Sequence, residues 1–176
     1  MALHLIGVKQ TASMHLLTAF VRSVEPKGNH IRKEEEMRKI DTIVIHCSAT
    51  PEGMTYPLDS LRADHKKRGF VDVGYHYYIR KDGTVQEGRP IDKAGAHAQG
   101  HNAHSIGICY EGGLDENRKP KDTRTEAQKR SMLILIKATL KLYPGIVTIC
   151  GHRDFEGVKK DCPCFNALEE YKHLLT

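Results

Sequence analysis

One short apolar run constrains the fold of this 176-residue chain more than any other stretch. Residues 40–50 read IDTIVIHCSAT, and the run itself is the TIVI of residues 42–45. Four branched residues are too few for a helix, and turn-forming residues bound them, so the pattern predicts a buried strand. His46 follows at once, where a sheet would hold it rigidly at the edge of a cleft. That position suits a metal ligand or an acid–base group, and the alternative is a histidine satisfied by a loop carbonyl.

A second stretch, residues 151–164, favours the metal. It reads GHRDFEGVKKDCPC, and His152 follows the last predicted strand as His46 follows the first. If these strand ends lie together in the sheet, two imidazoles and the Cys162 thiolate converge. Three nitrogen and sulfur ligands suit zinc, and a fourth position left to water makes such a site catalytic. Two less favoured alternatives are a structural zinc with Cys164 as fourth ligand, and a peptidase with Cys162 as nucleophile.

Three further polar side chains could complete such a site. Lys160 lies two residues before Cys162, and residues two apart in an extended segment point the same way, so its ammonium could stabilise an oxyanion. Tyr75 begins an aromatic segment, and His97 lies in a loop rich in glycine and alanine, where backbone can approach a ligand closely. Each also has a simpler interpretation: a solvated lysine, core packing of the tyrosine and an exposed histidine.

The rest of the pattern predicts an α/β fold, with a mixed central β-sheet flanked by helices in a single domain. A Lys-Asp-Gly turn at residues 81–83 predicts a hairpin. Thr125 with Gln128 predicts the N-terminal cap of a long helix. The apolar stripe of this helix is expected at Leu133, Ile136 and Leu140. The other expected elements are helices at residues 58–68 and 165–175 and strands at residues 73–80, 84–87, 105–110 and 146–150.

The first 39 residues differ from the rest in charge and pattern. They hold seven Lys/Arg and four Asp/Glu, which leaves twenty and eighteen for the remaining chain, so a nucleic-acid partner is not indicated. Their apolar patch at residues 14–21 lacks a basic flank and a cleavage site, and is too short to span a membrane. We therefore expect residues 1–39 to be a poorly ordered N-terminal extension, residues 40–176 to be the domain, and Met37 to be an alternative start.

From residue 40 to about residue 175, the chain resembles the zinc-dependent type 2 N-acetylmuramoyl-L-alanine amidases. This family includes small phage endolysins and the peptidoglycan recognition proteins. The matching pieces are IVIHCSAT, DVGYHYYIRKDGTV, GAHAQGHNAHSIGI and GHRDFEGVKKDCPCF, in this order. The resemblance implies one zinc ion per chain in a surface groove. It also implies zinc ligands at His46, His152 and Cys162, catalytic residues at Tyr75 and Lys160, and a substrate-lining histidine at His97.

The chain departs from the family pattern in two respects. It has no tryptophan, whereas relatives often carry one in the first helix and one just after it, near Asp64 and Phe70 here. Aromatic contacts to the glycan are therefore in question, although the metal chemistry is not. Cys164 stands where relatives often have serine. Five cysteines without framework spacing do not indicate a disulfide scaffold, and fit a reducing compartment or a metal role better.

The resemblance implies hydrolysis of the amide bond between N-acetylmuramic acid and the L-alanine of the peptidoglycan stem peptide. A phage-type endolysin is expected, made in the cytoplasm without a signal peptide and acting on the cell wall after release. The alternatives are a cytosolic amidase that recycles muropeptides and a non-catalytic peptidoglycan recognition module. A complete set of ligands together with Lys160 favours an enzyme. The expected partner is peptidoglycan or a muropeptide, with no nucleic acid and no membrane insertion, and the protein is expected to be a monomer.

Overall fold

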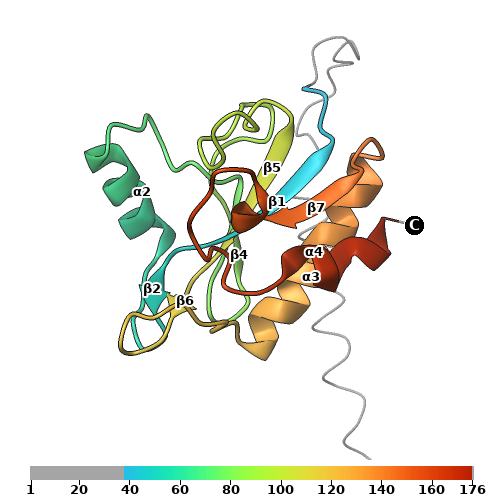
Figure 1. Cartoon of the computed structure of the whole chain (residues 1–176). Coiled ribbons are helices and arrows are strands. Elements are labelled where there is room, and N and C mark those ends of the chain that lie inside the picture. The colour runs from blue at the N-terminus through green and yellow to red at the C-terminus, as the bar shows by residue number, and fades with distance from the viewer. Residues whose placement is uncertain (1–37, 176) are drawn as a thin grey trace, which may run out of the picture. The chain divides into compact units, whose positions relative to one another are not determined.

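The computed structural model describes residues 38–175 (Figure 1). Nearly all of the predicted N-terminal extension, including its apolar patch at residues 14–21, lies outside the described residues. Within residues 38–175, no helix is long and apolar enough to cross a bilayer.

A five-stranded mixed sheet forms the centre of the domain, with the strand order β4-β3-β5-β1-β7. β1 pairs in parallel with β5 and β7, β5 pairs in parallel with β3, and the hairpin strand β4 is antiparallel to β3. The predicted mixed sheet is therefore confirmed. The strands are β1 Thr42–Cys47, β3 Tyr77–Ile79, β4 Val85–Glu87, β5 Ser105–Tyr110 and β7 Thr148–Gly151. A second small sheet, which the sequence did not predict, pairs β2 Thr50–Pro51 with β6 Gly113–Leu114.

The predicted strand at residues 73–80 is wrong over most of its length, because only Tyr77–Ile79 is strand. At the start of this segment, the backbone forms hydrogen bonds with groups outside the sheet. The amide of Gly74 donates to the His65 side chain, and its carbonyl accepts from the amide of Ala96. Residues 73–76 therefore join a loop and a helix to the sheet, and Tyr75 lies outside the ladder.

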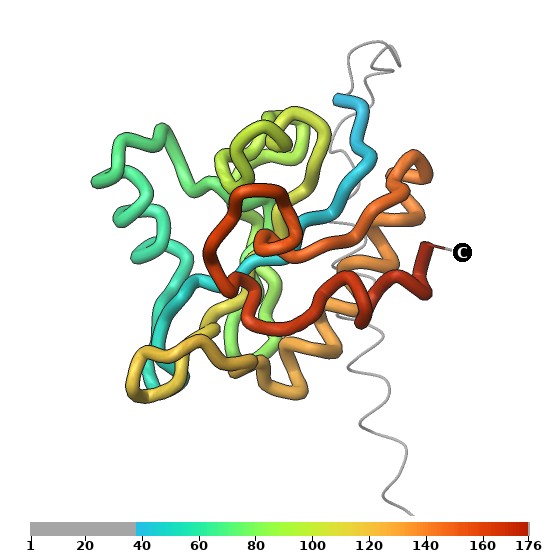
Figure 2. Tube along the Cα trace, in the orientation of Figure 1, coloured from blue at the N-terminus to red at the C-terminus, as the bar shows by residue number. Residues whose placement is uncertain are grey.

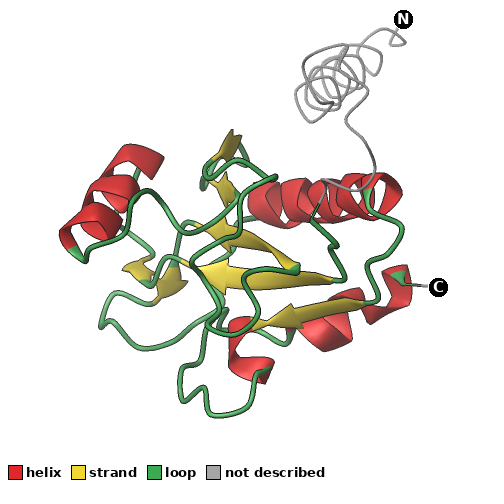
Figure 3. Cartoon of the chain, turned by 90° about the horizontal axis from the view of Figure 1, so that it is seen from above, coloured by secondary structure: helices red, strands yellow, loops and turns green. Residues whose placement is uncertain are grey.

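Three helices pack around the central sheet: α2 Leu58–Lys67, α3 Glu126–Leu142 and α4 Ala167–Tyr171 (Figure 3). α3 contacts β3, and α4 contacts β7. The predicted cap of α3 is confirmed, since the Thr125 hydroxyl accepts from the Gln128 amide and the Gln128 side chain accepts from the Thr125 amide. The predicted helix at residues 165–175 is shorter than expected, since Asn166 caps α4 and the short 3-10 helix Lys172–Leu174 follows it.

The predicted apolar stripe of α3 is correct only at Ile136. Leu133 and Leu140 are half-buried, and the fully covered side chains include Met132 and Leu135 instead. The reason is Gln128, whose amide nitrogen donates to two backbone carbonyls of the sheet region, those of residues 79 and 111. These hydrogen bonds fix the rotation of the helix, so the residues that follow Gln128 at helical spacing face inward.

The two faces of the central strands carry different side chains, although both are buried. Side chains alternate along a strand, and paired residues in neighbouring strands share a face. One face carries a layer of isoleucines: Ile43 and Ile45 from β1, Ile106 and Ile108 from β5, Ile79 from β3 and Ile149 from β7. The other face, here called the histidine face, carries Val44, His46, His76, Tyr78, Gly107 and Cys109. Leu58 and Leu61 of α2 pack on this second face.

Candidate metal centre and active site

The register of the sheet brings His46 and His152 together, as the sequence predicts. β1 and β7 are parallel with Ile45 opposite Gly151, so the next residue of each chain segment lies at the same edge. The two imidazole centroids are 4.8 Å apart. His46 is 1% exposed within β1, and His152 begins the short 3-10 helix His152–Asp154 directly after β7.

Cys162 reaches the same point from a loop. Its Sγ lies 3.7 Å from Nδ1 of His46 and accepts a hydrogen bond of 3.4 Å from the Cys47 amide. The ligand atoms of His46, His152 and Cys162 all lie within 4.8 Å of one another. Two nitrogens and one sulfur at this spacing fit a zinc ion, whose bonds of about 2.0–2.3 Å hold tetrahedral ligands slightly closer together. The three predicted ligands therefore form one group.

Cys164, the alternative thiol, does not join this group. Its Sγ lies 3.8 Å from Sγ of Cys47, on the far side of Pro163 from Cys162. The hydrogen bond to Cys47, followed by burial, raises the pKa of the Cys164 thiol, so this thiol stays protonated. Its geometry does not favour a closed structural site with four protein ligands.

The electrostatics of the group suit a cation. Burial, followed by the neighbouring His97 and His152, holds the pKa of His46 well below its ordinary value, so the imidazole is neutral with a lone pair to offer. A hydrogen bond from the Cys47 side chain is the largest cause that lowers the pKa of the Cys162 thiol. Both shifts favour the protonation states that a metal ligand needs.

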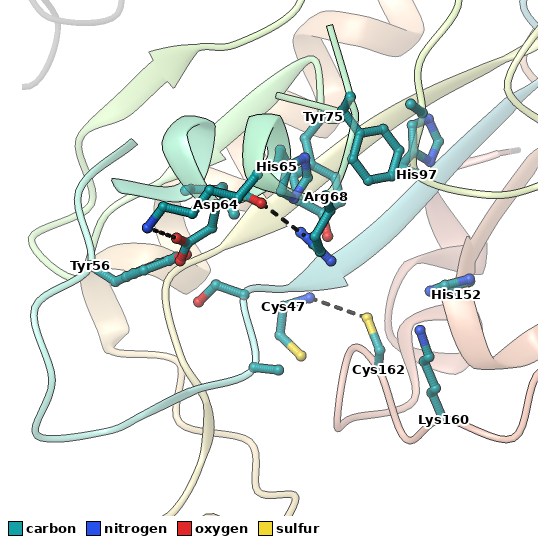
Figure 4. A pocket seen from close by; sticks show the side chains of 16 residues that line it. Cys47, Tyr56, Asp64, His65, Arg68, Tyr75, His97, His152, Lys160 and Cys162 are labelled. Atoms are coloured by element: carbon teal, nitrogen blue, oxygen red, sulfur yellow. Dashed lines mark hydrogen bonds and ion pairs between the residues drawn. The ribbon is translucent and has the colours of Figure 1, made fainter. Parts of the chain in front are cut away.

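Tyr75 and Lys160 face this group from opposite walls of one cavity (Figure 4). The Tyr75 ring centroid lies 5.0 Å from that of His46. Burial raises the pKa of the Tyr75 phenol well above its ordinary value, so the phenol is protonated at neutral pH. Lys160 is exposed on the loop that carries Cys162. Burial, followed by the charge of Lys160, lowers the pKa of His152. The expectation that Lys160 and Cys162 point into one pocket agrees with this arrangement.

His97 is more deeply buried than a residue that only lines a groove. It is 9% exposed, and its Nδ1 lies 3.0 Å from Nε2 of His46. It still contributes to the wall of the cavity beside Tyr75. The structure thus brings all six predicted site residues into one place, and puts His97 behind His46, a predicted metal ligand.

The cavity has a volume of about 610 Å³. α2 and the segment after it form one wall, and Asp64 and Phe70 both belong to it, at the positions near which relatives often carry tryptophan. The loop at residues 152–164 forms the opposite side. Figure 2 shows this loop beside the segment between β4 and β5. His101 of that segment stacks on Phe155 of the loop, with ring centroids 3.9 Å apart.

Sequence reasoning missed several residues of this cavity. The Tyr56 hydroxyl donates to Asp64 at 2.5 Å, and His65 accepts from the Gly74 amide at 2.9 Å. The Arg68 guanidinium lies 5.6 Å from the Phe70 ring centroid. A signal existed for His65 alone, because helical spacing places it on the same face as the buried leucines of α2. Tyr56 lies in a loop whose path no local pattern predicts.

Comparison with known proteins agrees with this geometry. The family model described as N-acetylmuramoyl-L-alanine amidase matches residues 36–165. The chain is 39% identical to the endolysin of Escherichia phage T7 over 132 residues, which cover 75% of this chain and 85% of that protein. It is 30% identical to a peptidoglycan-recognition protein of Drosophila melanogaster over 141 residues, or 77% of this chain and 75% of that protein. Among solved structures, the endolysin amidase LysCS from Clostridium intestinale superposes with a TM-score of 0.65 at 34% identity, covering 80% of this chain and 85% of that one.

Proposed function

Because the chain belongs to the N-acetylmuramoyl-L-alanine amidase family, we propose that it is a zinc-dependent enzyme of the endolysin type. It hydrolyses peptidoglycan at the amide bond between N-acetylmuramic acid and the L-alanine of the stem peptide. The observation that carries the zinc proposal is the convergence of His46, His152 and Cys162, with ligand atoms within 4.8 Å of one another. When bound at such a three-ligand site, zinc supplies a Lewis acid and a water that ionises near neutral pH.

Tyr75 holds the attacking water in this proposal. Its phenol is protonated and lies beside His46, so it can donate a hydrogen bond to one partner and accept one from another. A water held between the phenol and the ligand group is oriented towards an amide carbonyl in the cavity. Orientation of this kind lowers the barrier because the reacting atoms meet without further loss of freedom.

Lys160 stabilises the negative charge that develops on the carbonyl oxygen. It lies on the same loop as Cys162 and lines the same cavity. A fixed ammonium makes a strong interaction with an oxyanion and a weaker one with a neutral carbonyl, so it favours the transition state over the bound substrate. Removal of one such donor typically costs about 3–4 kcal/mol of activation free energy.

Product analysis tests this proposal directly. Purified peptidoglycan is digested with the protein, with and without a chelator, and the products are identified by mass spectrometry. We expect each cut to add one water and to leave a free lactyl carboxyl group and a free L-alanine amine. The chelator should abolish this product, and zinc should restore it. Cleavage at another bond, or full cleavage by metal-free protein, would overturn the proposal.

A second assay separates an endolysin from a recycling amidase. Intact sacculi and soluble muropeptides are supplied to the same preparation, and the initial rates are compared. An endolysin releases peptides from sacculi, whereas an enzyme that accepts only soluble muropeptides has the recycling role.

A further inference from the structure

The two ring nitrogens of His46 face different partners. Nδ1 points towards Sγ of Cys162 at 3.7 Å, within the ligand group. Nε2 lies on the other side of the ring, 3.0 Å from Nδ1 of His97. The two rings meet edge to face, with centroids 5.0 Å apart and an interplanar angle of 79°. His97 therefore contacts the one nitrogen of His46 that does not face the other ligands.

This arrangement fixes the proton of His46 when Nδ1 binds a metal. A neutral imidazole carries one hydrogen, and the nitrogen without it offers the lone pair. If Nδ1 of His46 is the ligand atom, the hydrogen lies on Nε2 and is donated to Nδ1 of His97. Hydrogen bonds of this kind hold ligand histidines in one tautomer and one orientation.

Two glycines leave the space that the His97 ring occupies. A Cβ atom on Gly107 would lie 2.6 Å from Cδ2 of His97, and one on Gly95 would lie 2.4 Å from it. Gly107 is in the middle of β5, directly opposite Val44 of β1, so a side chain there would fill the space beside His46. A glycine inside a strand often marks the close approach of another group, and here that group is the His97 ring.

The main chain around His97 is also held. The amides of His97 and Ala98 both donate to Oδ1 of Asn102, at 2.8 and 3.0 Å. This side chain closes the loop on itself and fixes the backbone from which the imidazole projects. The position of Nδ1 of His97 is therefore set from the backbone as well as by the glycines.

The burial of His97 argues against a packing role. Its other nitrogen, Nε2, is buried and has no hydrogen-bond partner among residues 38–175. A buried, unpaired polar atom destabilises the folded state, so an apolar side chain would fill this space at lower cost. The feature that an apolar residue could not supply is the contact of Nδ1 with His46.

We propose that His97 is a positioning residue that holds His46 with Nε2 protonated and Nδ1 turned towards the metal. The inference rests on the proposed zinc function. It assigns His97 a role different from the substrate contact that the family resemblance implies. The two roles predict different results, since a positioning residue changes zinc affinity and a substrate contact changes only the binding of peptidoglycan.

Three substitutions at one position test the role. In His97→Asn, the side-chain oxygen stands where Nδ1 stands, so the acceptor for His46 is kept. In His97→Gln the amide reaches the position of Nε2 instead, and His97→Leu has no acceptor. Zinc affinity is measured on each full-length protein by competition with a chelator. We expect His97→Leu and His97→Gln to bind zinc about 10–100-fold more weakly, and His97→Asn to stay within a few-fold of the unaltered protein.

His101→Leu is the matched control. His101 lies in the same loop, where its ring stacks on Phe155 and its carbonyl accepts from the Ser105 hydroxyl. The zinc affinity of the His101→Leu protein should equal that of the unaltered protein. Melting temperatures of the zinc-free proteins show whether a variant has lost its fold, and His97→Asn and His97→Gln are similar enough in size and polarity to be compared even if His97→Leu fails to fold.

Nitrogen NMR of the histidine side chains reads the tautomer itself. In zinc-free protein, the His46 ring should carry its hydrogen on Nε2, and His97→Gln should convert it to a mixture of tautomers. Equal zinc affinity in all three variants with an unchanged tautomer would overturn the proposal, as would a loss confined to peptidoglycan binding. If the unaltered protein binds no zinc, the proposed function fails, and the tautomer of His46 still decides the role of His97.

Discussion

The two faces of the central sheet are made by the same strands and serve different purposes. In β1, Ile43 and Ile45 alternate with Val44 and His46, and in β5 two isoleucines alternate with Gly107 and Cys109. Both faces are buried, so neither can be recognised from exposure alone. The isoleucine face consists mainly of aliphatic side chains that gain free energy by leaving water, and it also carries Tyr110, whose hydroxyl donates to the Pro163 carbonyl. The histidine face contains groups that lose free energy on burial unless they find partners.

On the histidine face, each buried imidazole has a partner at one nitrogen or more. His65 accepts from the Gly74 amide, His76 accepts from the Gly107 amide, and His46 contacts His97. These partners are backbone groups and another imidazole, and Nε2 of His76 also lies 3.2 Å from the Arg38 guanidinium. Burial lowers the pKa of both His46 and His76, so these imidazoles are neutral, and the proposed zinc site lies where the Cys162 thiol meets His46. Successive residues of one strand therefore alternate between the isoleucine face, which stabilises the fold, and the histidine face, which carries polar groups of the candidate site.

The largest effect is expected from the ligand group of the histidine face. Cys162→Ala removes the thiolate, so zinc affinity should fall by more than the roughly hundredfold typical of an indirect contact, and cleavage should be lost. The melting temperature of the zinc-free protein should change little, because Cys162 is only half-buried. Bound zinc per chain is measured after purification. Cys164→Ala is the control, and loss of zinc in that variant with retention in Cys162→Ala would identify Cys164 as the ligand.

The next effect separates catalysis from metal binding on the same face. Lys160→Ala and Tyr75→Phe should each lower kcat by roughly two or more decades, because in the proposed mechanism each removes an interaction made with the reacting centre. Both variants should keep their zinc and still sediment with sacculi. The double variant should lose less than the product of the two single losses, since both groups act on one reaction. Near-native cleavage by Lys160→Ala would remove the lysine from the mechanism.

The isoleucine face should respond in the opposite way. Ile108→Ala leaves a cavity in a fully buried layer and should lower the free energy of unfolding by about 2–5 kcal/mol. Zinc affinity of the folded protein should stay the same, because the side chain points away from the ligand group. Urea unfolding of the zinc-free protein and chelator competition at low temperature measure the two quantities. A large loss of zinc affinity in folded Ile108→Ala would show that the two faces are coupled.

The sequence predicts the elements of this sheet better than it predicts their limits. The runs TIVI and SIGICY are buried on both faces, so strand formation follows from composition alone. The limits of β3 depend on Gly74, whose amide donates to the His65 side chain and whose carbonyl accepts from the Ala96 amide. The rotation of α3 depends on hydrogen bonds from Gln128 to the sheet region. Both are tertiary interactions between residues far apart in sequence, and local periodicity contains no information about them.

In the candidate site too, some residues can be predicted from local sequence and others depend on tertiary contacts. His46 and His152 are predictable because His46 lies near the end of β1 and His152 directly follows β7, and parallel strands end at the same edge of a sheet. Cys162 and Lys160 follow from their spacing in an extended loop. The depth of His97 is not predictable, because it depends on Gly107 of another strand providing the space for its ring. Tyr56 and Arg68 join the cavity only through the position of α2.

A smaller, pH-dependent effect is expected from His65 of α2, the helix that packs on the histidine face. Burial, followed by the charge of Arg68, lowers the pKa of His65 to about 4 from an ordinary value of 6.5. The unfolded chain therefore binds a proton that the folded chain does not between these values. Stability from this group is complete above pH 6.5 and is lost as the pH falls towards 4, on the order of 2–3 kcal/mol.

His65→Asn isolates this contribution. Its side-chain oxygen can accept from the Gly74 amide, as Nδ1 of His65 does, but it does not titrate. The difference in unfolding free energy between the variant and the unaltered zinc-free protein should shrink or reverse as the pH falls from 7 to 4.5. A difference that stays constant with pH would show that His65 does not titrate in this range.

The smallest effect is expected from shortening the chain to begin at Met37. We propose that residues 1–36 form an extension with no function of their own, because their charge and pattern differ from those of the domain. Arg38 is different, since its guanidinium donates to the backbone carbonyls of Ile91, Asn102 and Ala103 at 2.8–3.2 Å. These carbonyls belong to the loop that carries His97, so Arg38 supports the histidine face at its edge.

A chain that begins at Met37 keeps this arginine and should match the full chain in melting temperature, zinc affinity and cleavage rate. Arg38→Ala in the full chain is the control, and it should cost on the order of 1–3 kcal/mol because hydrogen bonds from a charged group are lost. If the shortened chain loses more stability than Arg38→Ala does, residues 1–36 contribute to the domain and the proposed boundary is wrong.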